Sequence, residues 1–198
     1  MILSLDVRDW PVLVVGGGRV AIRKAETLVK EGARISVIAP HILESTVEFD
    51  RTLRGFQSGD CTGFRMVFAC TDSREVNALV GHEAKERGIL CNIADAPDES
   101  DFHNCAMVTR GAIKVGLSTG GNSAALAKHL REKIEAAIGD EYAQLAEILG
   151  ARRIAVKSGK NADARADAWR AVLGSDVLEL LSAGNRSEAE LRVDEILR

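Results

Sequence analysis

Residues 12–21, VLVVGGGRVA, constrain the fold more than any other stretch of this chain. Four apolar residues, three of them β-branched, predict a buried parallel strand. Three glycines interrupt it, and apolar residues at helical spacing follow as far as Val29. A strand, a glycine-rich turn and a helix in this order can hold the pyrophosphate of a dinucleotide. We therefore expect nucleotide binding here; an ordinary tight turn between a strand and a helix is the alternative.

The residues of this turn have separate expected roles. Gly16 makes the tight turn, Gly17 lets the backbone approach the phosphates, and the small Ala21 lets the helix pack on the strand. The N-terminus of the helix offers free N–H groups and the positive end of a dipole to an anion. The predicted cofactor contacts in this stretch are Gly16, Gly17, Gly18, Arg19 and Val20.

Strand-like and helix-like stretches alternate along the first half of the chain. We expect strands at residues 34–40, 65–72 and 89–95, a helix at 75–87, and a lead-in at 1–11 that includes an edge strand. This alternation predicts an α/β fold, a Rossmann-type parallel sheet with helices on both faces. Because ligands bind beyond the carboxyl ends of such strands, Thr71 and Asp95 should line one crevice with residues 16–18.

The end of the second strand lacks the acidic residue that usually binds the adenosine ribose. Ala39, Pro40 and His41 occupy this position, and the first carboxylate beyond them is Glu44. We expect the adenosine near Pro40 and His41. His41 could lie near a hydroxyl or a phosphate, or be a solvated loop residue, so NAD and NADP both remain open.

Asp95 follows the strand at 89–95 and precedes Pro97. A carboxylate at a strand end that faces a ligand crevice is a candidate for proton transfer. An aspartate before a proline is also common in turns, where it has a purely structural role. The two interpretations are evenly balanced from the residues alone.

A second glycine-rich turn, residues 120–123, lies between an expected strand at 112–119 and an expected helix at 124–138. Ser118, Thr119 and Ser123 place hydroxyl groups around the start of this helix, which suits an anionic group. Capping of the helix by Asn122 or Ser123 is the alternative.

From residue 139 onward the sequence predicts only short helices, at 141–156, 162–173, 176–183 and 188–197, with a loop at 157–161. Ser187 and Glu190 predict a capping box for the last helix. Positive charges exceed negative ones between residues 149 and 173, which suits a substrate with several carboxylates, although such runs are usually solvated. The basic residues are Arg152, Arg153, Lys157, Lys160, Arg165 and Arg170; the acidic ones are Asp163 and Asp167.

The composition excludes several other classes of protein. The chain has 198 residues, 46% of them hydrophobic, so it can form a core. Only 4% are aromatic and the net charge is -3, so no nucleic acid partner is expected. No run is apolar enough to span a membrane, and no signal peptide is expected. The four cysteines lack CxxC spacing, which favours reduced thiols in a cytoplasmic protein over a zinc site.

Four linked motifs make the sequence similar to the precorrin-2 dehydrogenase/ferrochelatase family, which includes the N-terminal part of siroheme synthases. Residues 14–24, VVGGGRVAIRK, match the family's GGGxVAxRK, and residues 69–72, ACTD, match its AATD-like turn. Residues 92–97, NIADAP, match NVxDxP, and Asp101 and Phe102 follow. Residues 117–123 and 130–135 match S[ST]GGxSP and LREK(I/L)E. The matches run in order from about residue 4 to about residue 138, whereas the tail agrees only in length and character.

This resemblance implies NAD-dependent oxidation of precorrin-2, a reduced tetrapyrrole with eight carboxylates, to sirohydrochlorin. It implies an NAD-binding Rossmann domain at residues 1–112, a dimerisation region at 113–148 and a helical, tetrapyrrole-facing domain at 149–198, in an intertwined homodimer. Asp95 takes the place of the family's catalytic acid. Thr71 completes the expected cofactor contacts, and the expected substrate contacts are Asn92, His103, Ser118 and Thr119.

The chain departs from the family pattern at two places. His103 and Asn104 replace the usual Pro-Ala or Pro-Ser, and Ala124 replaces a proline. His103 and Cys105, both possible metal ligands, therefore fall near Asp95 in sequence, but no metal site is predicted. Two alternatives stay open: a bifunctional enzyme that also inserts ferrous iron to give siroheme, and a non-catalytic nucleotide-sensing module.

Overall fold

The computed structural model describes residues 2–159 and 161–198, which divide into two compact units. The first unit ends at Asn104 and the second begins at Cys105. The three-part division expected from the sequence, with boundaries at 112 and 148, is finer than this and stays a prediction.

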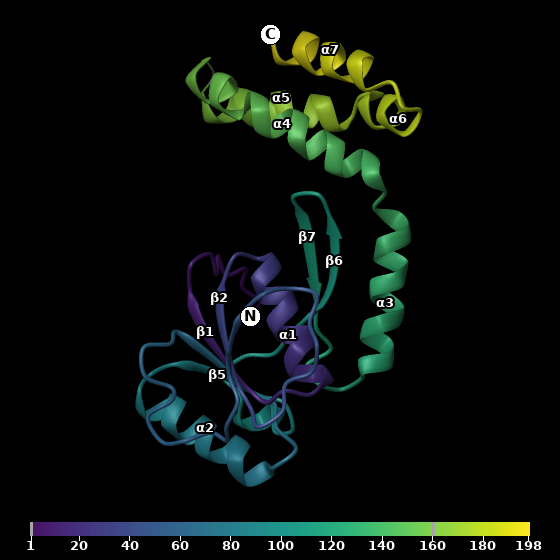
Figure 1. Ribbon diagram of the computed structural model, residues 1–198. Coiled ribbons are helices and arrows are strands. Elements are labelled where there is room, and N and C mark those ends of the chain that lie inside the picture. The colour runs from purple at the N-terminus through teal and green to yellow at the C-terminus, as the bar shows by residue number, and fades with distance from the viewer. Residues whose placement is uncertain (1, 160) are drawn as a thin grey trace. The chain divides into compact units, whose positions relative to one another are not determined.

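The first unit is built on a five-stranded, wholly parallel sheet with the strand order β3-β2-β1-β4-β5; Figure 1 labels β1, β2 and β5 of this sheet. This confirms the predicted α/β class. The central strand β1 is buried because it pairs on both sides, which explains its run of β-branched residues. The strands are β1 (Pro11–Val15), β2 (Arg34–Ile38), β3 (Asp50–Thr52), β4 (Met66–Ala69) and β5 (Leu90–Ile93).

Helices α1 (Arg19–Lys30) and α2 (Arg74–Glu86) cover opposite faces of this sheet. Side chains alternate along a strand, so β1 serves both cores. Val12 and Val14 pack with the inward face of α1, whereas Leu13 and Val15 pack with that of α2. Because α1 and α2 start beyond the carboxyl ends of β1 and β4, both helix N-termini lie at the end of the sheet where ligands bind.

The edge of the sheet next to β2 differs from the prediction. Residues 2–10 form no strand; the edge strand is β3, which consists of three exposed polar residues. β3 pairs with β2 through backbone hydrogen bonds. Its sequence therefore shows no alternation of apolar and polar residues from which a strand could be predicted. β3 was therefore not predicted, and the edge strand expected in the lead-in was wrong.

The second unit starts with a two-stranded antiparallel hairpin beside a helix (Figure 1). The predicted strand at 112–119 is β7 (Ile113–Leu117), and its partner β6 (Ala106–Arg110) was not predicted. The turn between them needs a glycine, because Gly111 has a φ of 53°. The helix that follows, α3 (Ala124–Ala137), ends beside Arg110, whose guanidinium donates to the Glu135 and Ile138 carbonyls.

Four helices complete this unit and share one apolar core: α4 (Asp140–Gly159), α5 (Ala162–Leu173), α6 (Val177–Ser182) and α7 (Arg186–Leu197). The predicted loop at 157–161 is partly wrong, because α4 continues to Gly159 and the cap of α5 is Asn161; Lys160 lies outside the described residues. The predicted capping box is also wrong. Asn185 precedes α7, so Ser187 lies inside its first turn and Glu190 pairs with Arg186.

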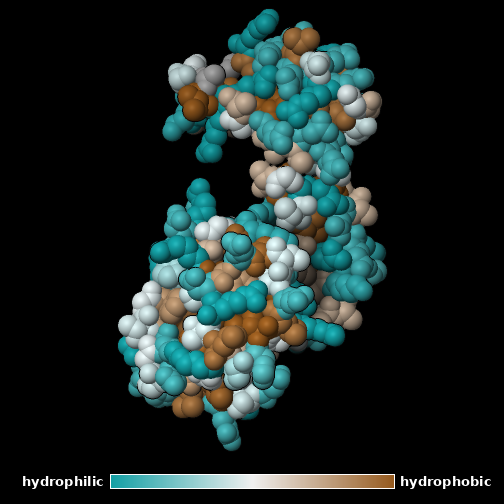
Figure 2. Space-filling model, in the orientation of Figure 1, coloured by the Kyte–Doolittle hydropathy of each residue, from teal (hydrophilic) through white to brown (hydrophobic). Residues whose placement is uncertain are grey.

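Polar residues dominate the visible face of the helices α4–α7, and apolar residues are scattered among them (Figure 2). No helix in the described part of the chain is long and apolar enough to cross a membrane. All four cysteines are free thiols, as predicted; Cys61, Cys70 and Cys91 are buried and Cys105 is half-buried.

Candidate nucleotide-binding site

A cavity of about 550 Å³ lies at the carboxyl ends of β1, β2 and β4. It brings together six of the residues predicted to contact a cofactor: Gly16, Gly17, Gly18, Pro40, His41 and Thr71. The other two, Arg19 and Val20, begin α1 as exposed residues and are not among the residues that line the cavity.

Two of the three glycines are required by the protein's own packing. Gly16 has a φ of 124°, and a Cβ atom there would lie 2.3 Å from the carbonyl oxygen of Cys70. A Cβ atom on Gly17 would lie 1.9 Å from the carbonyl oxygen of His41. Neither position can carry a side chain without moving a neighbouring strand end or loop.

Gly18 has a different environment, because a Cβ atom there would meet no atom within 4 Å. It is the N-cap of α1 and makes no side-chain cap. The start of α1 therefore has open space beside Gly18, as an anion-binding helix N-terminus requires. The close approach of a phosphate was predicted at Gly17, but the open surface lies at Gly18.

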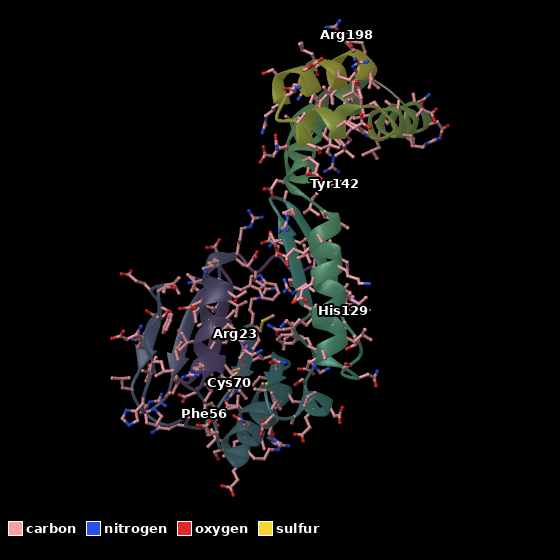
Figure 3. All side chains as sticks on the ribbon, turned by 90° about the vertical axis from the view of Figure 1, so that its right-hand side faces the viewer. Arg23, Phe56, Cys70, His129, Tyr142 and Arg198 are labelled. Atoms are coloured by element: carbon pink, nitrogen blue, oxygen red, sulfur yellow. The ribbon has the colours of Figure 1, made fainter. Side chains whose placement is uncertain are left out.

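The wall next to β2 is formed by residues 39–43 and is tied to the glycine turn. The N–H of Leu43 donates to the Gly17 carbonyl at 3.0 Å. Phe56, from the loop after β3, and Cys70, which follows β4, also line the cavity; Figure 3 labels both in the first unit. None of the lining residues that the structure describes is a lysine or an arginine, and their one carboxylate is Asp72, beyond β4.

Two ionisable side chains near the cavity are perturbed by burial. Burial raises the pKa of the Cys70 thiol to about 11, so this residue is a neutral thiol near pH 7. Burial lowers the pKa of Lys24, whose ammonium lies 4.8 Å from the centre of the Phe68 ring. Lys24 Nζ also donates to Asn92 Oδ1 at 2.9 Å and to Asn104 Oδ1 at 3.4 Å.

Asp95 follows β5 on an exposed turn, just before the short 3₁₀ helix η1 (Pro97–Glu99). It does not line the cavity itself, which differs from the predicted crevice. Its carboxylate is joined to the cavity wall through one residue, Asn77 of α2. Asn77 Nδ2 donates to Asp95 Oδ1 at 2.8 Å and to the Thr71 carbonyl at 3.0 Å. Asn77 Oδ1 accepts from the Thr71 N–H at 3.0 Å and from Thr71 Oγ1 at 2.8 Å.

Sequence reasoning missed Asn77, although a signal was present. Asn77, Val80 and Ala84 lie three and four residues apart and are all buried on the inward face of α2. A polar residue within the apolar stripe of a helix must find hydrogen-bond partners in the interior. The sequence pattern therefore identifies Asn77 as a residue that must form hydrogen bonds in the interior, but it does not identify its partners.

The expected substrate contacts have different surroundings. Asn92 is buried, and its amide is engaged at both ends, by Lys24 and by the Phe102 carbonyl. His103 and Ser118 are exposed. Thr119 Oγ1 donates to the Ser123 carbonyl. The Ser123 side chain caps α3 by accepting from the Leu126 N–H. Of the two predicted caps of this helix, Asn122 and Ser123, Ser123 is therefore confirmed.

Several basic residues of the helical segment already have acidic partners. Arg152 pairs with Asp194 and Arg170 with Asp167, whereas Arg153 and Lys157 are exposed. No cluster of three or more His, Cys, Asp or Glu residues that could hold a metal ion occurs among the described residues.

Three family models match successive parts of the chain. Residues 3–106 match "Putative NAD(P)-binding", residues 110–137 match "Sirohaem biosynthesis protein central", and residues 141–197 match "Sirohaem synthase dimerisation region". Among curated relatives, the siroheme synthase of Methylococcus capsulatus is 38% identical over 195 residues, and siroheme synthase 1 of Aeromonas salmonicida is 36% identical over 192 residues. The matches cover 95% and 93% of this chain but 41% of each relative, so the chain spans about two fifths of their length.

Among solved structures, "SirC, precorrin-2 dehydrogenase" matches with a TM-score of 0.80 and 22% sequence identity. The match covers 98% of this chain and 99% of that chain, which supports the same fold throughout. The chain therefore belongs to the family of proteins that combine an NAD(P)-binding region with the central and dimerisation regions of siroheme synthases, the family that its motifs predict.

Proposed function

We propose that this chain is an NAD-dependent dehydrogenase that oxidises precorrin-2 to sirohydrochlorin in siroheme biosynthesis. The observation that carries this proposal is the connection between an open helix N-terminus at Gly18 and a carboxylate at Asp95, through Thr71 and Asn77. The family membership and the printed name of the similar structure, a precorrin-2 dehydrogenase, favour this substrate.

The residues present fit a dinucleotide, because the space that a Cβ atom on Gly18 would enter is open. Bound NAD supplies the hydride acceptor. Gly18 and the first N–H groups of α1 would hold the pyrophosphate. Pro40 and His41, together with the apolar side chains of Ile42 and Phe56, would border the adenosine. Asp95 takes the proton that leaves the macrocycle when the hydride is lost. One of its carboxylate oxygens is held by Asn77, and the side chain is exposed to an incoming substrate.

Replacement of the proposed base tests the enzyme function directly. Asp95→Ala should lower kcat for NADH formation from precorrin-2 by about 10²- to 10⁴-fold, the usual contribution of a general base, with NAD affinity unchanged. Turnover is measured by NADH absorbance and affinity by calorimetry. Asp98→Ala, which removes an exposed carboxylate three residues away, is the matched control and should keep wild-type turnover. Full activity of Asp95→Ala would rule out its role as the base.

We propose NAD rather than NADP as the cofactor. The 2′-phosphate of NADP needs a cationic partner, and no lysine or arginine occurs among the described residues that line the cavity. A missing hydrogen bond to a charged group corresponds to roughly 10- to 100-fold in affinity. Calorimetric titration should therefore give an NADP dissociation constant about that much larger than the NAD value. Equal affinities would contradict this choice.

The glycine turn makes a paired prediction. Gly18→Val should fold like the wild type but lose most of its NAD affinity, because its side chain enters the space proposed for the pyrophosphate. Gly17→Ala should instead destabilise the fold, by about 1–3 kcal/mol or more, because its methyl group overlaps the His41 carbonyl. Thermal unfolding and NAD titration of both variants separate the two effects. A Gly18→Val protein that binds NAD normally would place the cofactor elsewhere.

We also propose that the chain forms a homodimer. Residues 141–197 match a dimerisation region, and α3 buries none of its residues although Leu126, Leu130 and Ile134 are apolar. Sedimentation equilibrium should therefore give twice the chain mass of 21.3 kDa. A monomer at micromolar concentration would contradict the proposal.

A further inference from the structure

We infer that Asn77 is a positioning residue that holds the Asp95 carboxylate in place for proton transfer. This inference rests on the proposed function, because it assigns a task to Asn77 only if Asp95 is the base. It concerns one hydrogen bond, from Asn77 Nδ2 to Asp95 Oδ1, with a length of 2.8 Å.

The orientation of the Asn77 amide follows from the backbone of one other residue. The N–H of Thr71 can only donate, so the atom of Asn77 that faces it must be the oxygen. The carbonyl of Thr71 can only accept, so the atom that faces it must be the amide nitrogen. The second N–H of this nitrogen points to Asp95. Asn77 therefore always presents a donor to the carboxylate and cannot present an acceptor.

Burial fixes this arrangement. The Asn77 side chain is fully buried, with 0% exposure. Any rotation of the amide would break its hydrogen bonds with the half-buried Thr71 and leave the buried polar atoms of Asn77 without partners, which is costly in a medium of low polarity. A hydrogen bond from such a rigid donor restricts the acceptor more than one from a mobile surface group.

Asp95 depends on this donor for its orientation. No other hydrogen bond reaches its carboxylate from the described residues, and the side chain is exposed. The surrounding turn is held separately by Ser100 Oγ, which accepts from the Ile93 N–H and contacts the Ile93 and Ala96 carbonyls. Loss of Asn77 should therefore free the carboxylate while the backbone of the turn stays in place.

The wall of the cavity should also survive the loss of Asn77. Thr71 Oγ1 keeps two other partners, the carbonyl and the N–H of Ser73. Ser73 in turn caps α2 by accepting from the Val76 N–H. We therefore expect substitution of Asn77 to impair turnover much more than cofactor binding, which distinguishes positioning of the base from a general defect.

A double-mutant cycle tests this inference. Asn77→Ala should lower kcat roughly 10- to 100-fold, the value of a hydrogen bond to a charged group, and change the NAD dissociation constant by less than about threefold. In the Asp95→Ala background, Asn77→Ala should cause no further loss of turnover, because it acts only through that carboxylate.

Glu83→Gln is the matched control: Glu83 is another buried polar residue of α2, but its partners are the N–H groups of Gly59 and Cys61 and the Arg87 side chain.

Two results of the cycle would overturn the inference: wild-type kcat in Asn77→Ala, or an equal loss from this substitution with and without the Asp95 carboxylate. The proposed function fails separately, if the wild-type protein forms no NADH from precorrin-2. If Asn77→Ala does not fold, Asn77→Asp serves instead, since it keeps the acceptor for the Thr71 N–H. The new carboxylate at position 77 lies at hydrogen-bonding distance from that of Asp95, and the two repel each other. The pH below which kcat falls should therefore rise by about one unit or more. An unchanged profile in this variant would also overturn the inference.

Discussion

The close packing of two glycines against two backbone carbonyls holds together the end of the sheet on which the proposed site depends. Gly16 lies against the end of β4 at Cys70, and Gly17 lies against the loop after β2 at His41. These contacts bring three strand ends to one place with little room between them. They leave Gly18 as the glycine that faces open space. In this turn, Gly16 and Gly17 therefore allow close packing within the protein, whereas Gly18 is free to contact a ligand.

Buried polar side chains of α2 hold further loops of the first unit in place. Asn77 joins the end of β4 to the turn after β5, and Glu83 accepts hydrogen bonds from the loop that precedes β4. No buried side-chain nitrogen or oxygen lacks a partner in the described part of the chain. Backbone groups supply half or more of these partners, so the helix that covers the sheet also holds the loop after β4, through Asn77, and the loop before β4, through Glu83.

The sequence predicted most of the elements that carry a hydrophobic period, and it failed where structure depends on backbone contacts. β1 and α1 were clear because their apolar residues follow the strand and helix periods. β3 was missed because its three exposed residues pair only through the backbone. Ser187 and Glu190 matched a capping box, but the preceding turn places the start of α7 earlier. Six of the residues that line the cavity were among the predicted cofactor contacts, whereas the link through Asn77 required three-dimensional distances.

Burial of Cys70 has a consequence for the reactivity of its thiol. Its thiol lines the cavity, and burial raises its pKa to about 11, so the neutral thiol predominates near pH 7. Peroxides and disulfides react with thiolates rather than thiols. The Cys70 sulfur should therefore react slowly with oxidants although it lies at the wall of the candidate nucleotide-binding cavity.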